Sequence, residues 1–124
     1  MPWIYHQSTG VLNYRHEHSS HPVGRGYSGA PGSMNKPTLE GVPFKGPIPR
    51  GNYHIGPMYH HHDKGPDVMN LTPVGHDAHK RDHFRIHGDN KHLNHSASEG
   101  CIILPKPIRL RLGHSLDKEL HVVW

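Results

Sequence analysis

The sequence predicts a single, mainly β domain in which short strands are joined by long loops and helix is scarce. Hydrophobic residues make up only 32% of the 124 residues, whereas 14 glycines and 12 prolines interrupt the chain at short intervals. This composition disfavours a helical bundle and favours short strands between shaped loops. Apolar and polar residues also alternate in several short runs, which is the period of a strand. The length suits one modest core, so we expect residues 1–124 to form one domain.

The N-terminal part of the chain predicts three strands. Trp3–Gln7 and Val11–Arg15 are β-prone runs separated by Ser8-Thr9-Gly10, which indicates a hairpin. His16–Ser20 indicates the next turn. Val23–Ser28 then suits a third strand, whose glycines weaken it or mark a bulge.

The middle of the chain predicts a long loop followed by a hairpin. Ala30–Lys45 is rich in Pro, Gly, Ser and Asn without periodicity, so we expect a surface loop that shapes a cleft. Strands are expected at Tyr53–Ile55 and Val68–Leu71, separated by a polar tip at Tyr59–Gly65. The polar residues of that tip suit a solvated loop.

The candidate chemistry lies between Phe84 and Leu104, a stretch that holds the only cysteine, Cys101. Phe84–Ile86 alternates and predicts a short strand that delivers His87 at its end, while Ile102–Leu104 predicts a buried strand. The polar residues between them can loop back and set an imidazole beside the thiol. An imidazole that takes the proton of a thiol, whose ordinary pKa is about 8.5, supplies the reactive thiolate.

The turn before the cysteine suits an oxyanion site. Gly100 permits a tight turn, and the backbone N–H groups around Gly100 and Cys101 can point at the oxyanion of an attacked carbonyl. Ser98 and Glu99 flank this turn. The residues alone leave a second interpretation open, because an unpaired cysteine is often a small buried hydrophobe.

Two other histidines compete with His87 for the role of base. His92 and His95 fall inside the loop, where they would be held less rigidly than a histidine at a strand end. We therefore favour His87. The group that orients its second nitrogen stays open, with a backbone carbonyl, Asp89 or Ser96 as candidates.

Two histidine clusters raise the question of a metal site. Adjacent residues of a strand point to opposite faces, so the run His60–His62 suits a solvated loop better than a metal site. His76, His79 and His83 would share one helix face, but Pro73 and Gly75 precede them and a strand follows. We expect a polar loop at the rim of a cleft and no metal or other cofactor.

Charge and hydropathy restrict the partners. The net charge of +4 and the pI near 9.4 favour a polyanion, either nucleic acid or the carboxylate-bearing cell wall. The absence of an arginine-rich run or a series of stacking aromatic residues argues against nucleic acid. No apolar run approaches a membrane span, and the start lacks the features of a secretory signal, so we expect no membrane association and a signal-less export route.

Two motifs in the stretch that holds Cys101 resemble those of a known enzyme family. Ser98-Glu99-Gly100-Cys101, preceded by a strand that ends in His87-Gly88, resembles the active-site signature of the YkuD-like L,D-transpeptidases. The residues from Phe84 to Asn90 and from Ala97 to Pro105, with Arg109 after them, resemble the type VI secretion L,D-transpeptidase effector family more closely. Tyr27-Ser28-Gly29 and the segment Gly46–Gly56 resemble further elements of the same fold.

The resemblance covers nearly the whole chain and implies a mostly antiparallel β-sandwich of the L,D-transpeptidase type. The residues themselves predict a short helix that begins near Lys106 after Pro105 and is closed by Gly113, and the alternation of Glu119–Val123 predicts a closing strand. The site residues that the resemblance implies are the catalytic Cys101, His87 and Arg109, the turn residues Gly100 and Ser98, and the substrate-binding Tyr27, Ser28 and Asp89. Arg111 is the rival of Arg109 and suits a solvated face.

The activity implied by the resemblance is peptidoglycan modification without a metal. Cys101 would attack the carbonyl before the terminal D-alanine of a stem tetrapeptide, giving L,D-carboxypeptidase or L,D-transpeptidase chemistry. The implied setting is the periplasm of a rival cell, reached through type VI secretion, with an immunity protein guarding the producer. Glu99 departs from the general motif, which has histidine there. The alternatives are a histidine-rich metal-dependent hydrolase or nuclease toxin and a non-catalytic cell-wall-binding module.

Overall fold

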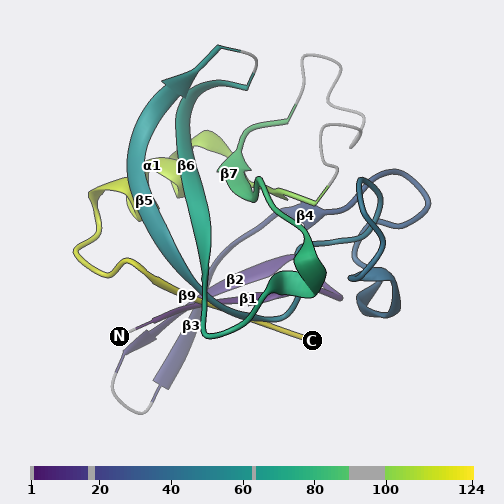
Figure 1. The fold of residues 1–124 in the computed structure, drawn as a ribbon. Helices are drawn as coiled ribbons and strands as arrows, with labels where there is room; N and C mark the ends of the chain where they lie inside the picture. Colours follow the sequence, from purple (N-terminus) through teal and green to yellow (C-terminus); the bar gives the residue numbers. More distant parts are fainter. Residues whose placement is uncertain (1, 17–18, 63, 90–99) are drawn as a thin grey trace.

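The protein is described by a computed structural model that covers residues 2–16, 19–62, 64–89 and 100–124. In these described residues the strands join into one nine-stranded sheet, and the single α-helix, α1 (Lys106–His114), follows the cysteine. Within the described residues the predicted mainly β fold with one short helix is confirmed (Figure 1). Neighbouring strands are antiparallel except for the pairs β1–β9 and β7–β8.

The first hairpin forms as predicted from β1 (Trp3–His6) and β2 (Val11–His16). Strand β3 (Ser19–Arg25) begins inside the region for which we predicted a turn, so that prediction was wrong at its C-terminal end. Exposed side chains dominate β3, and polar residues such as serine are tolerated on an exposed edge strand. The pairing register shifts between Leu12, opposite Gly24, and Asn13, opposite Pro22, so of the two predicted effects of the glycines a bulge is seen beside Gly24.

The sheet is curled, and the two strands that form its edges follow each other directly in the sequence. Its strand order is β3-β2-β1-β9-β5-β6-β7-β8-β4, so β3 and β4 (Tyr27–Ser28) form opposite edges. Only Gly26 separates these two strands in sequence. The predicted strand Val23–Ser28 is therefore two strands that belong to the two edges. Gly26 leaves no room for a Cβ atom, because that atom would overlap the carbonyl oxygen of Ile103 in β8.

A long hairpin replaces the two short central strands of the prediction. β5 (Gly51–His61) and β6 (Gly65–Val74) extend through most of the expected polar tip, and they arch along one side of the molecule in Figure 1. The prediction was too short because polar residues occupy the exposed positions of both strands. A register shift between Ile55 and Met58 accommodates the proline between them.

The strands of the candidate site are short and lie near the β4 edge. β7 (Arg85–His87) pairs with β6 on one side and with β8 (Ile102–Ile103) on the other. The closing strand β9 (Glu119–Val123) has the predicted bounds and lies between β1 and β5. Helix α1 packs on β6 and continues through Gly113, one residue beyond the predicted stop.

Buried side chains from both halves of the curled sheet form one core. Tyr5 and Leu120 come from one half, whereas Ile86 and Ile102 come from the strands of the candidate site. These core contacts fix the backbone of β7 and β8. In the part of the chain that the structure describes, no helix has the length and apolarity needed to cross a membrane.

Candidate active site

The predicted base ends β7, and the predicted nucleophile directly precedes β8, the parallel neighbour of β7. β7 and β8 pair with Ile86 opposite Ile102 and with His87 opposite Ile103. Side chains alternate along a strand, and the two paired isoleucines belong to the core, so His87 points away from that core. The same alternation, extended one residue back from β8, assigns Cys101 to the face of His87. The usual spacing and rise of strands place their Cα atoms about 8 Å apart. The imidazole and the thiol can approach each other across that distance.

His87 has the environment of a neutral base. Its side chain is only 2% exposed, and Nδ1 lies 2.8 Å from the carbonyl oxygen of Gly88. A carbonyl oxygen only accepts, so Nδ1 carries the hydrogen and Nε2 carries the lone pair. Burial lowers the pKa of His87 to about 4; the hydrogen bond to Gly88 opposes this, and the charges of Lys64, Arg109 and Arg85 lower the pKa further. Within the described residues the buried Nε2 atom has no hydrogen-bond partner.

The carbonyl oxygen of Gly88 is the group that orients the His87 ring. Of the three candidates from the sequence, the backbone carbonyl makes the bond to Nδ1. Asp89 instead accepts a 2.7 Å hydrogen bond from the hydroxyl of Tyr27. Ser96, like the competing bases His92 and His95, lies outside the described residues.

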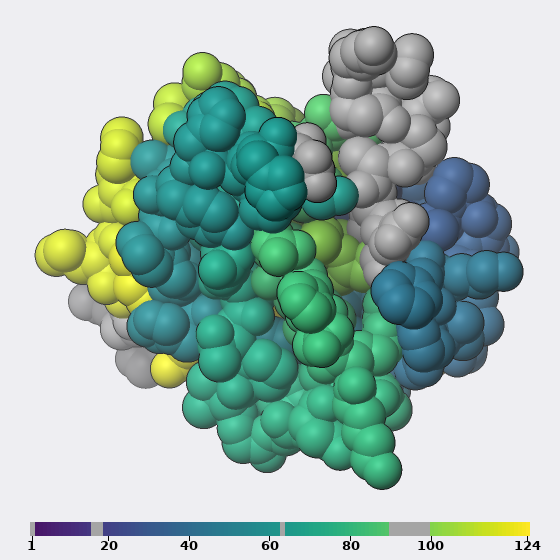
Figure 2. All heavy atoms as spheres, turned by 45° about the horizontal axis from the view of Figure 1, so that its top comes forward, coloured from purple at the N-terminus to yellow at the C-terminus, as the bar shows by residue number. Residues whose placement is uncertain are grey.

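Cys101 lies at the floor of a small cavity. Its side chain is 8% exposed, and Sγ is 3.7 Å from the carbonyl oxygen of His83. The cavity has a volume of about 170 Å³, and its charged or titratable lining residues are Lys64, Asp82, His83 and Arg85. Yellow-green atoms from the chain after residue 100 are visible at the centre of the face in Figure 2, beside the green atoms of the segment before β7.

The turn before Cys101 requires a glycine. Gly100 has a φ of +128°, a conformation that side chains rarely adopt, and a Cβ atom there would overlap Nη2 of Arg81. The hydroxyl of Ser28 donates to the Gly100 carbonyl at 3.5 Å and accepts the N–H of Ile48 at 2.8 Å. Ser28 is completely buried, so its position supports the turn and does not face a cavity. Ser98 and Glu99 lie outside the described residues.

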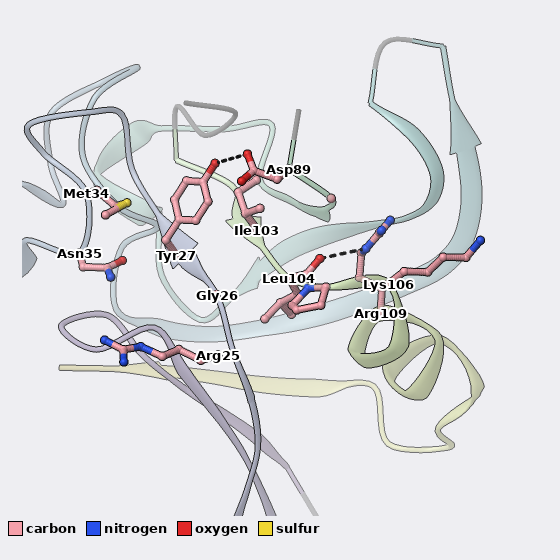
Figure 3. Close-up of a pocket in the computed structure, with 12 residues that line it drawn as sticks. Arg25, Gly26, Tyr27, Met34, Asn35, Asp89, Ile103, Leu104, Lys106 and Arg109 are labelled. Carbon is pink, nitrogen blue, oxygen red and sulfur yellow. Dashed lines mark hydrogen bonds between the residues drawn. The ribbon is translucent and has the colours of Figure 1, made fainter. Parts of the chain in front are cut away.

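A larger cavity of about 680 Å³ lies on the His87 side of the site. Tyr27 and Asp89, two of the predicted substrate-binding residues, line it and are joined by the hydrogen bond drawn in Figure 3. The lining also carries Arg25, Lys106 and Arg109, so cations outnumber carboxylates there by three to one. This lining suits a ligand with carboxylate groups.

Arg109 lines that larger cavity and is held by backbone carbonyls. Its Nε donates to Leu104 at 3.1 Å, and its Nη1 donates to Pro66 at 2.9 Å. The guanidinium also lies against Gly88, where a Cβ atom would be 2.8 Å from Nη2. Arg109 is therefore beside the base rather than in the cavity of the thiol. Arg111 is exposed, as its predicted solvated face requires.

Sequence reasoning missed Arg81, which lies against the turn of the nucleophile. It donates hydrogen bonds to the carbonyls of Glu40, Pro47 and Gly46, and it covers the ring of Phe84 with 5.6 Å between Cζ and the ring centroid. Arg81 belongs to a segment that we had considered only for its histidines. No local pattern marks it, because its partners come from a loop more than 30 residues away.

The histidine clusters do not converge. His76 packs against Tyr53, while His79 lies 3.2 Å from Glu40 and His83 lies 2.8 Å from Asp82. His60 and His61 are in β5, so the prediction of a loop for that run was wrong for these two residues. Among residues 2–16, 19–62, 64–89 and 100–124, no three His, Cys, Asp or Glu side chains gather as metal ligands would.

The site thus places, near one pair of parallel strands of a curled β domain, a cysteine and a neutral histidine, the two groups that a cysteine nucleophile and its base require. The sequence model of the Tlde1 domain matches residues 23–122. The chain therefore belongs to this family of type VI secretion L,D-transpeptidase effectors, and the family prediction is confirmed at that level. No curated protein and no solved structure gives a significant match.

Proposed function

We propose that this protein is a peptidoglycan-modifying cysteine enzyme that acts on stem tetrapeptides as an L,D-carboxypeptidase, an L,D-transpeptidase, or both. The observation that carries the proposal is the buried, neutral His87, whose Nδ1 is fixed by Gly88 and whose strand pairs with the strand that follows Cys101. A thiol nucleophile needs a base of this kind. Family membership supports the same chemistry.

The reaction would begin with rotation of the thiol from the His83 carbonyl towards His87. Nε2 takes the proton, and Sγ attacks the carbonyl carbon that precedes the terminal D-alanine. The N–H groups of Gly100 and Cys101 stabilise the oxyanion. The imidazolium then returns the proton to the departing amine, so D-alanine leaves and a thioester remains. Water gives the trimmed tripeptide, whereas an acceptor amine gives a crosslink or an exchanged D-amino acid.

We place the acidic part of the stem peptide in the larger cavity, between Tyr27 and Lys106. The excess of cations in its lining attracts carboxylates, and its position beside Gly88 and Asp89 connects it to the base. Tyr27 and Asp89 would orient this ligand. Arg109 would hold the helix and the base in place while adding positive charge, and Ser28 would support the Gly100 turn.

The setting follows from the family. Type VI effectors are delivered into target cells, and we propose that this one acts in the periplasm and that a cognate immunity protein protects the producer. No cofactor enters the proposed chemistry.

The test is incubation of purified protein with tetrapeptide muropeptides, beside Cys101→Ala and His87→Asn and with or without chelator. We expect the wild type to release or exchange D-alanine with or without chelator, and both variants to lose the activity by at least about a hundredfold. Activity abolished by chelator and retained by Cys101→Ala would instead identify a metal-dependent hydrolase. A wild type that makes no product would refute the proposed reaction.

A further inference from the structure

The histidine of the candidate site supplies no positive charge in its resting form. Because His87 is buried and its pKa is about 4, its resting form is the neutral imidazole and not an imidazolium beside the sulfur. Thiolates in enzymes are commonly stabilised by a nearby cation. A permanent positive charge near Cys101 would meet this need.

Arg81 has the position for that charge. Its Nη2 lies where a Cβ atom at Gly100 would be, and Gly100 is bonded directly to the nucleophile. Three backbone carbonyls, from Glu40, Gly46 and Pro47, hold the guanidinium against this turn. These bonds fix the guanidinium beside the nucleophile turn before any substrate arrives.

The electrostatics agree with this geometry. Partial burial lowers the pKa of Arg81, while the negative charges that Tyr53, Cys101 and Glu40 acquire on ionisation oppose that effect. The coupling is reciprocal, so a charge on Arg81 favours the ionised form of the thiol.

Other charged groups surround the same sulfur. Lys64, Asp82, His83 and Arg85 line its cavity. His87 ends the strand beside β8, and Glu40 acts on Arg81 from the loop. Lys64 and Arg85 add positive charge to that of Arg81, whereas Asp82 opposes it. Arg81 differs from these residues because its guanidinium is fixed by backbone carbonyls against the peptide that precedes Cys101.

We propose that Arg81 is a positioning residue that stabilises the Cys101 thiolate and ties the 40–47 loop to the nucleophile turn. This inference deepens the proposed function and rests on Cys101 being its nucleophile. It assigns the activation of sulfur to a fixed guanidinium and leaves His87 to transfer the proton.

The single cysteine makes a direct test possible, because the alkylation rate by iodoacetamide reports one thiol. The rate is measured from pH 5 to 10 in wild type, Arg81→Gln, Arg81→Lys and the control Arg50→Gln. Arg50 also binds the Glu40 carboxylate, but the described contacts of its side chain do not include the nucleophile turn. Circular dichroism and thermal unfolding establish that each variant is folded.

We expect Arg81→Gln to move the midpoint of the pH profile upwards and to slow alkylation at pH 7 by about tenfold, because less thiol is ionised. Arg81→Lys keeps the charge and should recover most of that loss, and Arg50→Gln should retain the wild-type midpoint. A structural role alone would change the plateau rate through access to the buried sulfur and leave the midpoint in place. An unchanged midpoint in folded Arg81→Gln would overturn the inference.

The alkylation test requires no peptidoglycan. A shifted midpoint in Arg81→Gln together with a wild type that releases no D-alanine would support the role of Arg81 and refute the proposed function. An unchanged midpoint in Arg81→Gln together with a wild type that releases D-alanine would refute the role of Arg81 and leave the proposed function standing.

Discussion

The buried neutral His87 makes a prediction about stability that does not depend on substrate. The folded protein holds the pKa of this imidazole near 4, whereas an unfolded chain restores it to about 6.5. Between these values the unfolded state binds a proton that the folded state does not. The free energy of unfolding therefore falls as pH decreases through this window, and most of the loss is complete near pH 4.

The difference in bound protons between the folded and unfolded states gives the size of this loss in the free energy of unfolding. Integrating between the two pKa values yields a loss of about 2 kcal/mol at pH 5 relative to pH 7 from this one residue. The perturbation is His87→Asn, because asparagine does not titrate and its amide can still donate to the Gly88 carbonyl. The matched control, His60→Asn, makes the same change at an exposed position of β5.

The assay is urea unfolding of the wild type and both variants at pH 7 and pH 5. We expect the difference between the two pH values to be about 2 kcal/mol smaller in His87→Asn than in the wild type, and to stay at the wild-type size in His60→Asn. If His87→Asn loses as much stability on acidification as the wild type, His87 titrates normally and is not the neutral base described above.

Three further predictions concern the supports of the site. Gly100→Ala should destabilise the protein by about 2 kcal/mol in urea unfolding and abolish D-alanine release, because its φ of +128° suits only glycine and Arg81 occupies the space of the new methyl group. Ser28→Ala should cost about 1 to 2 kcal/mol in the same assay, since the buried N–H of Ile48 loses its acceptor. Arg109→Gln should cost about 2 to 3 kcal/mol by leaving buried carbonyls unpaired, whereas Arg111→Gln on the exposed face should change the free energy of unfolding by less than about 0.5 kcal/mol. Equal losses in the two arginine variants would contradict the anchoring role of Arg109.

Local patterns predicted the elements whose side chains alternate cleanly. The first hairpin and β9 appear where the alternation places them, and the strand ending at His87 is displaced by only one residue. The long β5–β6 hairpin was underestimated because its middle contains histidines and prolines that local rules assign to loops. Pairing of both strands over their length overrides those preferences, and pairing is a property of the tertiary structure.

The curling of the sheet could not be predicted from local sequence patterns either. The residues around Gly26 do not indicate that the strands before and after it form opposite edges of one sheet. The curled sheet places Gly26 against the Ile103 carbonyl. β8 therefore lies beside β4, and this pairing positions the turn of the nucleophile.

The same reasoning explains why the candidate pair was predictable and its electrostatics were not. Cys101 and His87 lie at strand ends in motifs that a sequence displays directly. The groups that tune them arrive from elsewhere: the loop carbonyls that hold Arg81 come from residues 40–47, and the anchors of Arg109 come from the start of β6. Burial makes His87 a neutral base, and that burial is created by the curled sheet as a whole. The identity of the candidate pair is therefore visible in a local motif, whereas the neutral state of His87 and the stabilisation of the thiolate depend on long-range contacts, so these two properties can change among chains that keep the same motif.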